Sequence, residues 1–279
     1  MTIKKIGILY HPMIEAALTL ANKLQDFLTA KGVSVWLCSA WEGEQAKAQV
    51  NGTELILAIG GDGTILRAAQ VALPGQIPIT GINLGRLGFM TELSAAEAEK
   101  KLPALLEGEE GWVDERAMLE AKFQLSKSEP SRIFYALNDV VVARGGVARV
   151  VYVEASIDGE TLTTYKGDGV IVATATGSTG YSLAAGGPIL PPQAKEFLLL
   201  PIMPHLSLAY PMVLPATVAV RLHLATTHQA TLSIDGHINL PLGSGAVITV
   251  RHSSKIGRFL RIHPQASFYT SLEQKLKGR

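Results

Sequence analysis

The sequence predicts an α/β N-terminal domain built on a parallel sheet, followed by a mostly β C-terminal domain. Over the first hundred residues, apolar runs of strand length alternate with segments of helical periodicity, and after Trp112 the runs become short, β-branched and separated by turn residues. Strands that alternate with helices favour a parallel sheet with right-handed crossovers. We therefore expect a first domain over residues 1–112, a β-rich second domain over 113–254, and a tail over 255–279 that packs back on the first domain.

The elements of the first domain follow from the spacing of its apolar residues. A helix is expected over 13–32, where apolar residues recur every three or four positions until Gly32 ends the pattern. Two more helices are expected, from Thr64 to Val71 and over 95–106. The expected strands are the short apolar runs 4–10, 33–38, 54–61 and 77–85.

The second domain contains short β-branched runs bounded by turn residues. These predict strands over 118–125, 134–144, 150–157, 161–167, 169–175, 218–225, 230–234 and 246–252. The pair Asp158–Gly159 predicts a hairpin turn, and the residues alone also favour a hairpin over 230–240. The tail from 267 to 279 has helical character.

Composition excludes several classes of protein. The net charge of +1 offers no basic field for nucleic acid, and 47% hydrophobic with 18% charged residues is typical of a globular chain. The single cysteine, Cys38, lies among apolar residues, so we expect a core residue in a reducing compartment. The uncharged run 197–220 contains four prolines and cannot form one spanning helix, and we expect no signal peptide, because the apolar stretch near the N-terminus is short and is typical of a first strand. We therefore expect a soluble cytoplasmic protein without a membrane partner.

An acidic residue among glycines is the first functional signal. Residues 60–64 read "GGDGT" directly after an apolar strand, so backbone amides and the start of the next helix are placed to bind phosphate. A carboxylate about 4 Å from a phosphate oxygen is unfavourable by a few kcal/mol, which makes Asp62 unexpected in a loop that only holds phosphate. An acid there suits a residue that meets Mg²⁺ or accepts a proton from a hydroxyl attacking phosphorus. The stretch thus indicates phosphoryl transfer.

Other motifs of nucleotide chemistry are absent. The chain has no P-loop, no G-x-G-x-x-G opening a helix in the first domain and no protein-kinase signature. The seven histidines are scattered without zinc-ligand spacing, so no protein metal site is expected.

A second dense stretch occupies residues 165–190. After Asp168 and Gly169 and a short strand come seven consecutive glycine and hydroxyl residues, 176–182, and then Gly186 and Gly187. A glycine-rich loop of this length is entropically unfavourable to order unless it wraps a ligand. Its amides and hydroxyls suit sugar, phosphate and base edges.

Six segments resemble, in order, the motifs of the NAD kinases. They are "GGDGT" at 60–64, "NLGRLGFMTEL" at 83–93, "ALNDVVVARG" at 136–145, "DGVIVATATGSTGYSLAAGGPIL" at 168–190, "PIMPHLSLAYPMVLP" at 201–215 and "SIDGH" at 233–237. The resemblance spans nearly the whole chain. It implies Mg²⁺-dependent transfer of a phosphoryl group from ATP to the 2′-hydroxyl of the adenosine ribose of NAD, which makes NADP. It also implies a two-domain fold with a returning tail, and a homodimer or homotetramer.

The resemblance also implies roles for particular residues. Asp62 is the expected catalytic base. The phosphate-binding residues are expected to be Gly60, Gly61, Gly63, Thr64 and Arg67. The residues expected to bind NAD are Asp62, Gly63, Asn138, Asp139, Arg149, Lys166, Asp168, Thr176, Thr179, Gly180, Tyr181, Ser182, Leu183, Ala184 and His237.

The chain departs from the family pattern at several positions. Ala175 stands where relatives usually have proline and Gly180 where they usually have alanine, and both changes loosen the loop. His237 occupies a position that is often glutamine, and Met203 and Leu208–Tyr210 differ from the commoner form of the 201–215 segment.

Two other functions stay open at this point. The glycine–aspartate loop also occurs in lipid and sugar kinases, although the chain has no basic amphipathic helix for a membrane. A dinucleotide-binding sensor without catalysis would bind NAD without turnover. The residues also leave open polyphosphate as donor, NAD or NADH as acceptor, and regulation by NADPH.

Overall fold

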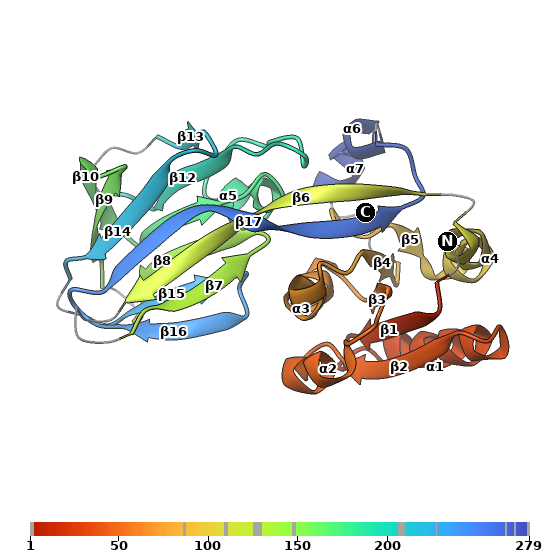
Figure 1. Cartoon of the computed structure of the whole chain (residues 1–279). Coiled ribbons are helices and arrows are strands. Elements are labelled where there is room, and N and C mark those ends of the chain that lie inside the picture. The colour runs from red at the N-terminus through yellow and green to blue at the C-terminus, as the bar shows by residue number, and fades with distance from the viewer. Residues whose placement is uncertain are drawn as a thin grey trace. The chain divides into compact units, whose positions relative to one another are not determined.

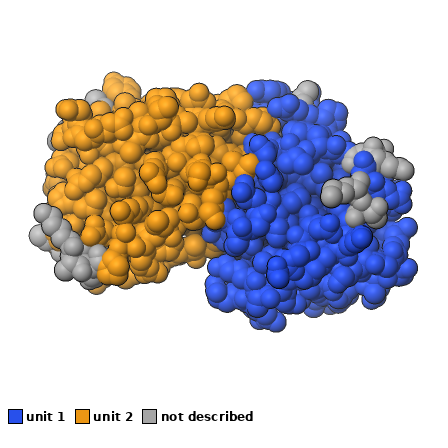
Figure 2. Space-filling model, viewed as in Figure 1, with its two compact units in different colours: residues 1–115, 257–279 blue, residues 116–256 orange. Residues whose placement is uncertain are grey.

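The computed structural model describes residues 3–85, 88–108, 111–124, 130–146, 149–205, 210–226, 228–265, 267–270 and 272–277. These fall into two compact units, which Figure 2 colours separately: unit 1 comprises residues 1–115 and 257–279, and unit 2 residues 116–256. The chain enters unit 2 along β6 (Trp112–Gln124) and leaves it along β17 (Val247–Arg261). The unit boundaries therefore lie inside strands. Arg86, Leu87, Leu125, Leu208 and Ala209, which belong to the segments discussed above, lie outside the described residues.

Unit 1 is built on a parallel sheet, as the sequence predicts (Figure 1). Its strand order is β2 (Ser34–Ser39), β1 (Lys5–Tyr10), β3 (Leu55–Ile59) and β4 (Ile79–Asn83). The short β5 (Leu93–Ser94) also pairs in parallel with β4, and Phe259 near the end of β17 lies opposite Ile79. The carboxyl ends of the parallel strands all meet at one edge, where open α/β sheets place their ligands.

The helices of unit 1 are α1 (Glu15–Ala30), α2 (Gly43–Gln49), α3 (Asp62–Ala72), α4 (Ala95–Glu107), α6 (Ser267–Thr270) and α7 (Leu272–Leu276), with a 3₁₀ turn at Leu73–Gly75. Helix α2 escapes prediction because Ala46 is its one buried residue, so no apolar period marks it. Helix α3 begins at Asp62, two residues earlier than expected, because Gly61 has extended backbone and takes the N-cap position.

Apolar side chains alternate between the two faces of this sheet. Ile8 and Leu57 share one buried cluster with residues of α1 and α4, such as Leu24 and Leu102. At two positions of the sheet, Gly7 and Gly81, there is no space for a side chain. A Cβ on Gly7 would lie 2.1 Å from the Trp36 ring, and one on Gly81 would lie 2.4 Å from Cδ1 of Ile65. The close approach of helix and ring to the backbone depends on these glycines.

Unit 2 contains a six-stranded antiparallel sheet in the order β13 (Met212–Leu214), β12 (Phe197–Ile202), β11 (Gly169–Ala173), β8 (Asp139–Arg144), β15 (Ala230–Ile234) and β16 (Ile238–Leu242). A second group pairs β10 (Glu160–Gly167) with β9 (Val151–Ile157), β9 with β14 (Ala219–Leu224), β14 with β17, and β6 with β7 (Arg132–Ala136). Alternate residues of both groups, such as Val142 and Leu222, form one core. Unit 2 is thus mostly β, as the sequence predicts, and its two groups of strands pack as a sandwich (Figure 1).

Two details of unit 2 refine the expected strands. The run 134–144 is not one strand but two, β7 and β8, separated by Leu137 and Asn138. Asp158 and Gly159 have φ values of 51° and 93° and join β9 to β10, which confirms the predicted hairpin turn.

The uncharged run 197–220 folds as β12, β13 and the start of β14. Within the described residues, no helix combines the length and hydropathy that a membrane-spanning segment requires.

The glycine-rich stretch covers the outer face of the six-stranded sheet. Ala185 and Leu190 pack against a second buried cluster that includes Ile171 and Leu200. The stretch itself forms a 3₁₀ turn at Gly177–Thr179 and a short helix, α5 (Tyr181–Ala184). Because both faces of β11 and β12 are covered, these strands are apolar throughout and show no alternation.

We expect Gly7→Ala to lower the stability of the chain, because the added methyl group overlaps the Trp36 ring. The ring is 7% exposed, and its N–H is anchored by donating to Thr53 Oγ1 at 2.8 Å. Overpacking of this kind typically destabilises by about 1–3 kcal/mol, which urea denaturation can measure. Gly43→Ala is the matched control, since its Cβ meets nothing within 4 Å. Equal midpoints for the Gly7 variant and the wild type would contradict this packing.

Candidate functional site

The "GGDGT" stretch forms a tight turn between β3 and α3 at the carboxyl edge of the parallel sheet. Gly60 has φ 152°, and a Cβ there would lie 2.3 Å from Thr64 Oγ1. Gly61 and Gly63 are exposed, whereas the Thr64 hydroxyl is buried and lacks a hydrogen-bond partner among the described residues. The turn therefore presents exposed backbone at the positive end of α3, which suits an anion.

Asp62 is held by a neighbouring loop and not by its own helix. Its Oδ2 accepts a hydrogen bond from the Phe89 N–H at 2.9 Å, and its Oδ1 accepts one from the Met90 N–H at 3.0 Å. A Cβ on Gly88 would lie 2.3 Å from Asp62 Oδ1, so the carboxylate rests directly on this backbone. Asp62 is partly exposed, which leaves the carboxylate accessible while its direction is set by two amides.

Arg67 lies against an aromatic side chain at the same edge of the sheet. Its guanidinium stands 4.2 Å from the centre of the Trp41 ring, and His11 packs on Trp41 with ring centres 4.5 Å apart. Burial lowers the pKa of Arg67. Stacking occupies the face of a guanidinium and leaves the N–H donors around its edge for an anion.

The turn Leu137–Asp139 in unit 2 is shaped by Asp235. The Asp235 carboxylate accepts three backbone hydrogen bonds, from Leu137 at 2.9 Å, Asn138 at 2.7 Å and Asp139 at 3.1 Å. These amides therefore point to Asp235 instead of a neighbouring strand, which explains the break between β7 and β8. Asn138 Oδ1 is buried without a hydrogen-bond partner among the described residues.

Asp139 sits in the interior beside this acid. It is 6% exposed, and burial together with the nearby Asp235 raises the pKa of Asp139 from 3.8 to about 7. Around neutral pH the carboxyl group can thus act as a hydrogen-bond donor as well as an acceptor.

The glycine-rich stretch is anchored to the same turn. The Thr174 hydroxyl donates to the Leu137 carbonyl at 2.6 Å, and the Thr174 N–H donates to the Asn138 carbonyl at 2.8 Å. A Cβ on Gly177 would lie 2.1 Å from that Asn138 oxygen. The structure therefore brings Asn138 and Asp139 together with the start of the predicted NAD-binding loop.

Within the loop, polar groups differ in exposure. Tyr181 is 47% exposed, whereas Ser182 is fully buried and its Oγ lacks a partner among the residues described. The Thr179 hydroxyl donates to the Thr176 carbonyl at 3.2 Å, and Thr176 Oγ1 accepts from Arg116 at 3.4 Å. Gly180, Leu183 and Ala184 are partly or fully exposed.

The remaining predicted residues have partners of their own. Asp168 pairs with Arg144 at 3.0 Å, and the Lys166 ammonium lies 5.6 Å from the centre of the Tyr152 ring. Arg149 is exposed, and its Nη1 lies 3.1 Å from His228 Nε2.

His237 lies in the turn between β15 and β16, which confirms the predicted hairpin. Its Nδ1 is 3.0 Å from the Asp235 carbonyl oxygen. Asp235 thereby connects His237 to the Leu137–Asp139 turn.

Sequence reasoning missed the groups that orient the predicted residues. Asp235 resembles Asp158, since both precede glycine in a hairpin turn with positive φ. The Asp158 carboxylate, however, accepts a hydrogen bond from the Ala219 N–H at 2.8 Å, whereas Asp235 binds the three amides of the Leu137–Asp139 turn. Asp235 lies in the family-like segment 233–237, but that resemblance does not show which backbone groups its carboxylate binds. Gly88, Phe89 and Met90 stood in a family-like segment, which signalled importance without showing that their backbone contacts Asp62.

We expect the stability of unit 2 to fall as pH rises from about 4 to about 7, because the folded chain keeps the Asp139 proton that the unfolded chain releases. Above about pH 7, Asp139 is ionised in the folded chain as well, and the buried charge lowers the free energy of unfolding by its full amount. Asp139→Asn carries no charge, so its urea midpoint should gain on that of the wild type as the pH rises through this window. Glu196→Gln, at an exposed acid of unit 2, is the control. Parallel pH profiles for wild type and Asp139→Asn would contradict the raised pKa.

Two family models match the chain: the ATP-NAD kinase N-terminal domain over residues 38–110 and the ATP-NAD kinase C-terminal domain over residues 137–262. An NAD kinase of Dehalococcoides mccartyi is 51% identical over 99% of this chain and 96% of its own length, and one of Chloroflexus aggregans is 38% identical over 99% of each. Among solved structures, yeast NADH kinase complexed with NADH has a TM-score of 0.86 at 25% identity, covering 99% of this chain and 88% of its own. An NAD kinase from Archaeoglobus fulgidus in complex with ATP has a TM-score of 0.76 at 26% identity, covering 99% of each chain. The chain belongs to the NAD kinase family.

Proposed function

We propose that this chain transfers the terminal phosphoryl group of ATP to the 2′-hydroxyl of the adenosine ribose of NAD and so makes NADP. Family membership supports the reaction. The structural observation that carries the assignment is Asp62, an accessible carboxylate at the start of α3 whose direction is set by the Phe89 and Met90 amides. A carboxylate in a phosphate-binding turn repels the phosphate and so weakens binding, but it can accept a proton from the acceptor hydroxyl.

Asp62 acts as the base toward the acceptor hydroxyl. Phosphoryl transfer through a loose transition state needs mainly positioning and charge neutralisation. The base therefore takes the proton late in the reaction, and the fixed orientation of the Asp62 carboxylate matters most. The backbone of Gly60, Gly61, Gly63 and Thr64, of which Gly61 and Gly63 are exposed, binds phosphate oxygens together with the N-terminus of α3. Arg67 adds its edge donors from its position on Trp41.

The residues fit Mg²⁺ held largely by the substrates' phosphates. The described part of the chain has no group of three or more histidine, cysteine, aspartate or glutamate side chains that could hold a metal ion. One Asp62 oxygen accepts from the Phe89 N–H and the other from the Met90 N–H, which leaves lone pairs for a cation, and Asp62 is our proposed protein ligand. When bound, the ion neutralises charge on the phosphates.

Unit 2 binds NAD around the Leu137–Asp139 turn and the loop anchored to it. Asn138 Oδ1 and Ser182 Oγ, which have no partner among the described residues, support this, because a buried polar atom requires a hydrogen-bond partner that a ligand can supply. Asp139 and Asp168 contact hydroxyl or amide groups of the dinucleotide, and the exposed Tyr181 ring covers part of it. The other proposed contacts are Arg149, Lys166, Thr176, Thr179, Gly180, Leu183, Ala184 and His237.

We further propose a homodimer or homotetramer, on the basis of family resemblance, and polyphosphate as a second donor to be compared with ATP. Sedimentation velocity of the purified chain tests the assembly. A monomer at micromolar concentration would reject it.

We expect Asp62→Asn to lower turnover about 10²–10⁴-fold while NAD still binds, because the base is lost and the shape of the side chain is kept. The measurement is NADP formation from NAD, ATP and Mg²⁺, with Asp26→Asn, an exposed acid on α1, as control. No NADP from the wild type with either donor would reject the proposed function. ADP formed with a lipid or sugar acceptor instead would indicate a different kinase, and NAD binding without turnover a sensor.

We expect Tyr181→Ala to raise the KM for NAD more than it lowers kcat, because the exposed ring is proposed to bind the dinucleotide. Loss of stacking on an aromatic ring is worth about 1 kcal/mol or more, or roughly fivefold in KM. Tyr181→Phe should keep most of the affinity, and Tyr269→Ala, at an exposed ring in unit 1, should change nothing. An unaltered KM in Tyr181→Ala would remove this residue from the site.

A further inference from the structure

A buried arginine in unit 1 contacts Met90, a residue whose N–H orients Asp62. The Met90 N–H donates to Asp62 Oδ1 at 3.0 Å, and the Met90 carbonyl accepts from Arg261 Nη1 at 2.8 Å. Met90 is thus hydrogen-bonded on one side to the proposed base and on the other to the last residue of β17. A shift of the guanidinium would be transmitted to the carboxylate through one residue.

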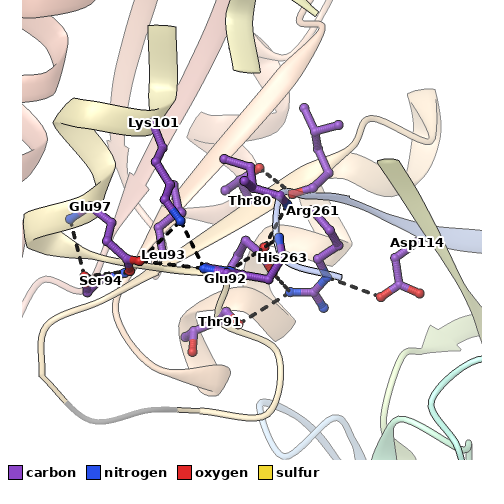
Figure 3. Close-up of polar contacts among 12 residues, drawn as sticks. Thr80, Thr91, Glu92, Leu93, Ser94, Glu97, Lys101, Asp114, Arg261 and His263 are labelled. Atoms are coloured by element: carbon purple, nitrogen blue, oxygen red, sulfur yellow. Dashed lines mark hydrogen bonds and ion pairs between the residues drawn. The ribbon is translucent and has the colours of Figure 1, made fainter. Parts of the chain in front are cut away.

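The position of Arg261 is itself strongly determined. The residue is 5% exposed, its Nε lies 3.2 Å from Asp114 Oδ2, and its Nη1 lies 3.3 Å from Glu92 Oε2 (Figure 3). The guanidinium also stands 4.7 Å from the centre of the Phe259 ring. Two buried carboxylates and a ring leave little freedom, because a buried charge must keep its partners.

Glu92 ties the same loop to the chain beyond β17. Its Oε1 accepts hydrogen bonds from the Ile262 N–H at 2.8 Å and the His263 N–H at 2.7 Å, and His263 Nδ1 lies 2.9 Å from it. Figure 3 shows these contacts converging on Glu92 beside Arg261. The segment 88–92 is therefore attached at Met90 and at Glu92 to residues 261–263.

The fit between this segment and Asp62 tolerates little movement. The carboxylate oxygen lies so close to Gly88 that a Cβ there would be 2.3 Å away. Hydrogen bonds also weaken steeply with distance and angle. Displacement of the Met90 backbone would consequently release or rotate the Asp62 carboxylate.

We propose that Arg261 is a positioning residue for phosphoryl transfer: its guanidinium holds the Met90 carbonyl and thereby the backbone of Phe89 and Met90, whose N–H groups orient the Asp62 carboxylate. This inference rests on the proposed role of Asp62 as base. It assigns a task in the reaction to a residue nearly 200 positions away in the sequence, and it explains why an ion pair is buried next to this loop. Arg261 itself touches no substrate in this proposal.

The test compares Arg261→Lys and Arg261→Gln with the wild type. Lysine keeps the charge for Asp114 and Glu92 but lacks the planar fork that reaches the Met90 carbonyl at the same time. We expect Arg261→Lys to lower kcat about 10–100-fold with less than about a threefold change in the KM for NAD, since misplacement by 1 Å is enough for such a loss. Arg258→Gln is the control, because Arg258 lies on the same strand, is more exposed and pairs with Glu115 at 3.3 Å.

Glutamine leaves two buried acids without their cation, so Arg261→Gln can fail to fold, and the lysine variant then carries the test. Folding is checked by the urea midpoint, and activity is measured well below it.

A double-mutant cycle separates positioning from general destabilisation. In the Asp62→Asn background, Arg261→Lys should have almost no further effect on kcat, because the group that it positions has already been removed. An equal fold-loss in both backgrounds would overturn the proposal, as would wild-type kcat in a folded Arg261→Lys variant. Failure of the wild type to form NADP is a different result, since it rejects the proposed function itself.

Discussion

Two peptide N–H groups set the direction of the Asp62 carboxylate, the proposed base in unit 1. The Phe89 and Met90 amides bind the Asp62 carboxylate, and they come from the loop after β4, whereas Asp62 begins the helix after β3. Peptide donors do not titrate and cannot rotate independently of the backbone, so they give a carboxylate a more lasting direction than a side chain would. Neighbouring parallel strands place both loops at one edge, which makes the contact a direct result of the sheet order.

Unit 2 also contains a carboxylate that accepts hydrogen bonds from backbone amides, but here the carboxylate shapes the backbone. Asp235 accepts three consecutive amides and thereby draws the Leu137–Asp139 turn out of the sheet. In unit 1 the amides orient a carboxylate that is partly exposed, while in unit 2 a buried carboxylate orients the amides. The second arrangement also places an acid beside Asp139, where burial and like charge raise the pKa. The hydrogen bonds to Asp235 therefore shape the Leu137–Asp139 turn and keep this acid beside Asp139, whose pKa is raised by burial and by Asp235.

Packing explains where the glycine-rich loop lies. The outer face of the six-stranded sheet is apolar, and Ala185 and Leu190 cover it. Apolar burial holds Ala173, which precedes the loop, and Ala185 on this face, and the segment between them exposes Tyr181 and encloses Ser182. Hydrogen bonds from Thr174 then attach the loop to the Asn138 turn.

The sequence by itself determined the classes of the two units, most of the strands and helices of unit 1, both hairpin turns and the residues that resemble those of the family. These depend on period, turn chemistry and glycine, all of which act over a few neighbouring positions. Three features became clear only in the structure. Helix α3 starts early because Gly61 takes the capping position, and α2 has too weak an apolar period to be predicted. The strand breaks at Leu137 because its N–H binds the distant Asp235 carboxylate. Only the tertiary structure showed that Met90, Asp235 and Arg261 orient the predicted residues. The reason is physical: backbone amides carry no signature in the sequence, and the pairing of Arg261 with a loop about 170 residues away exists only once the sheet has formed.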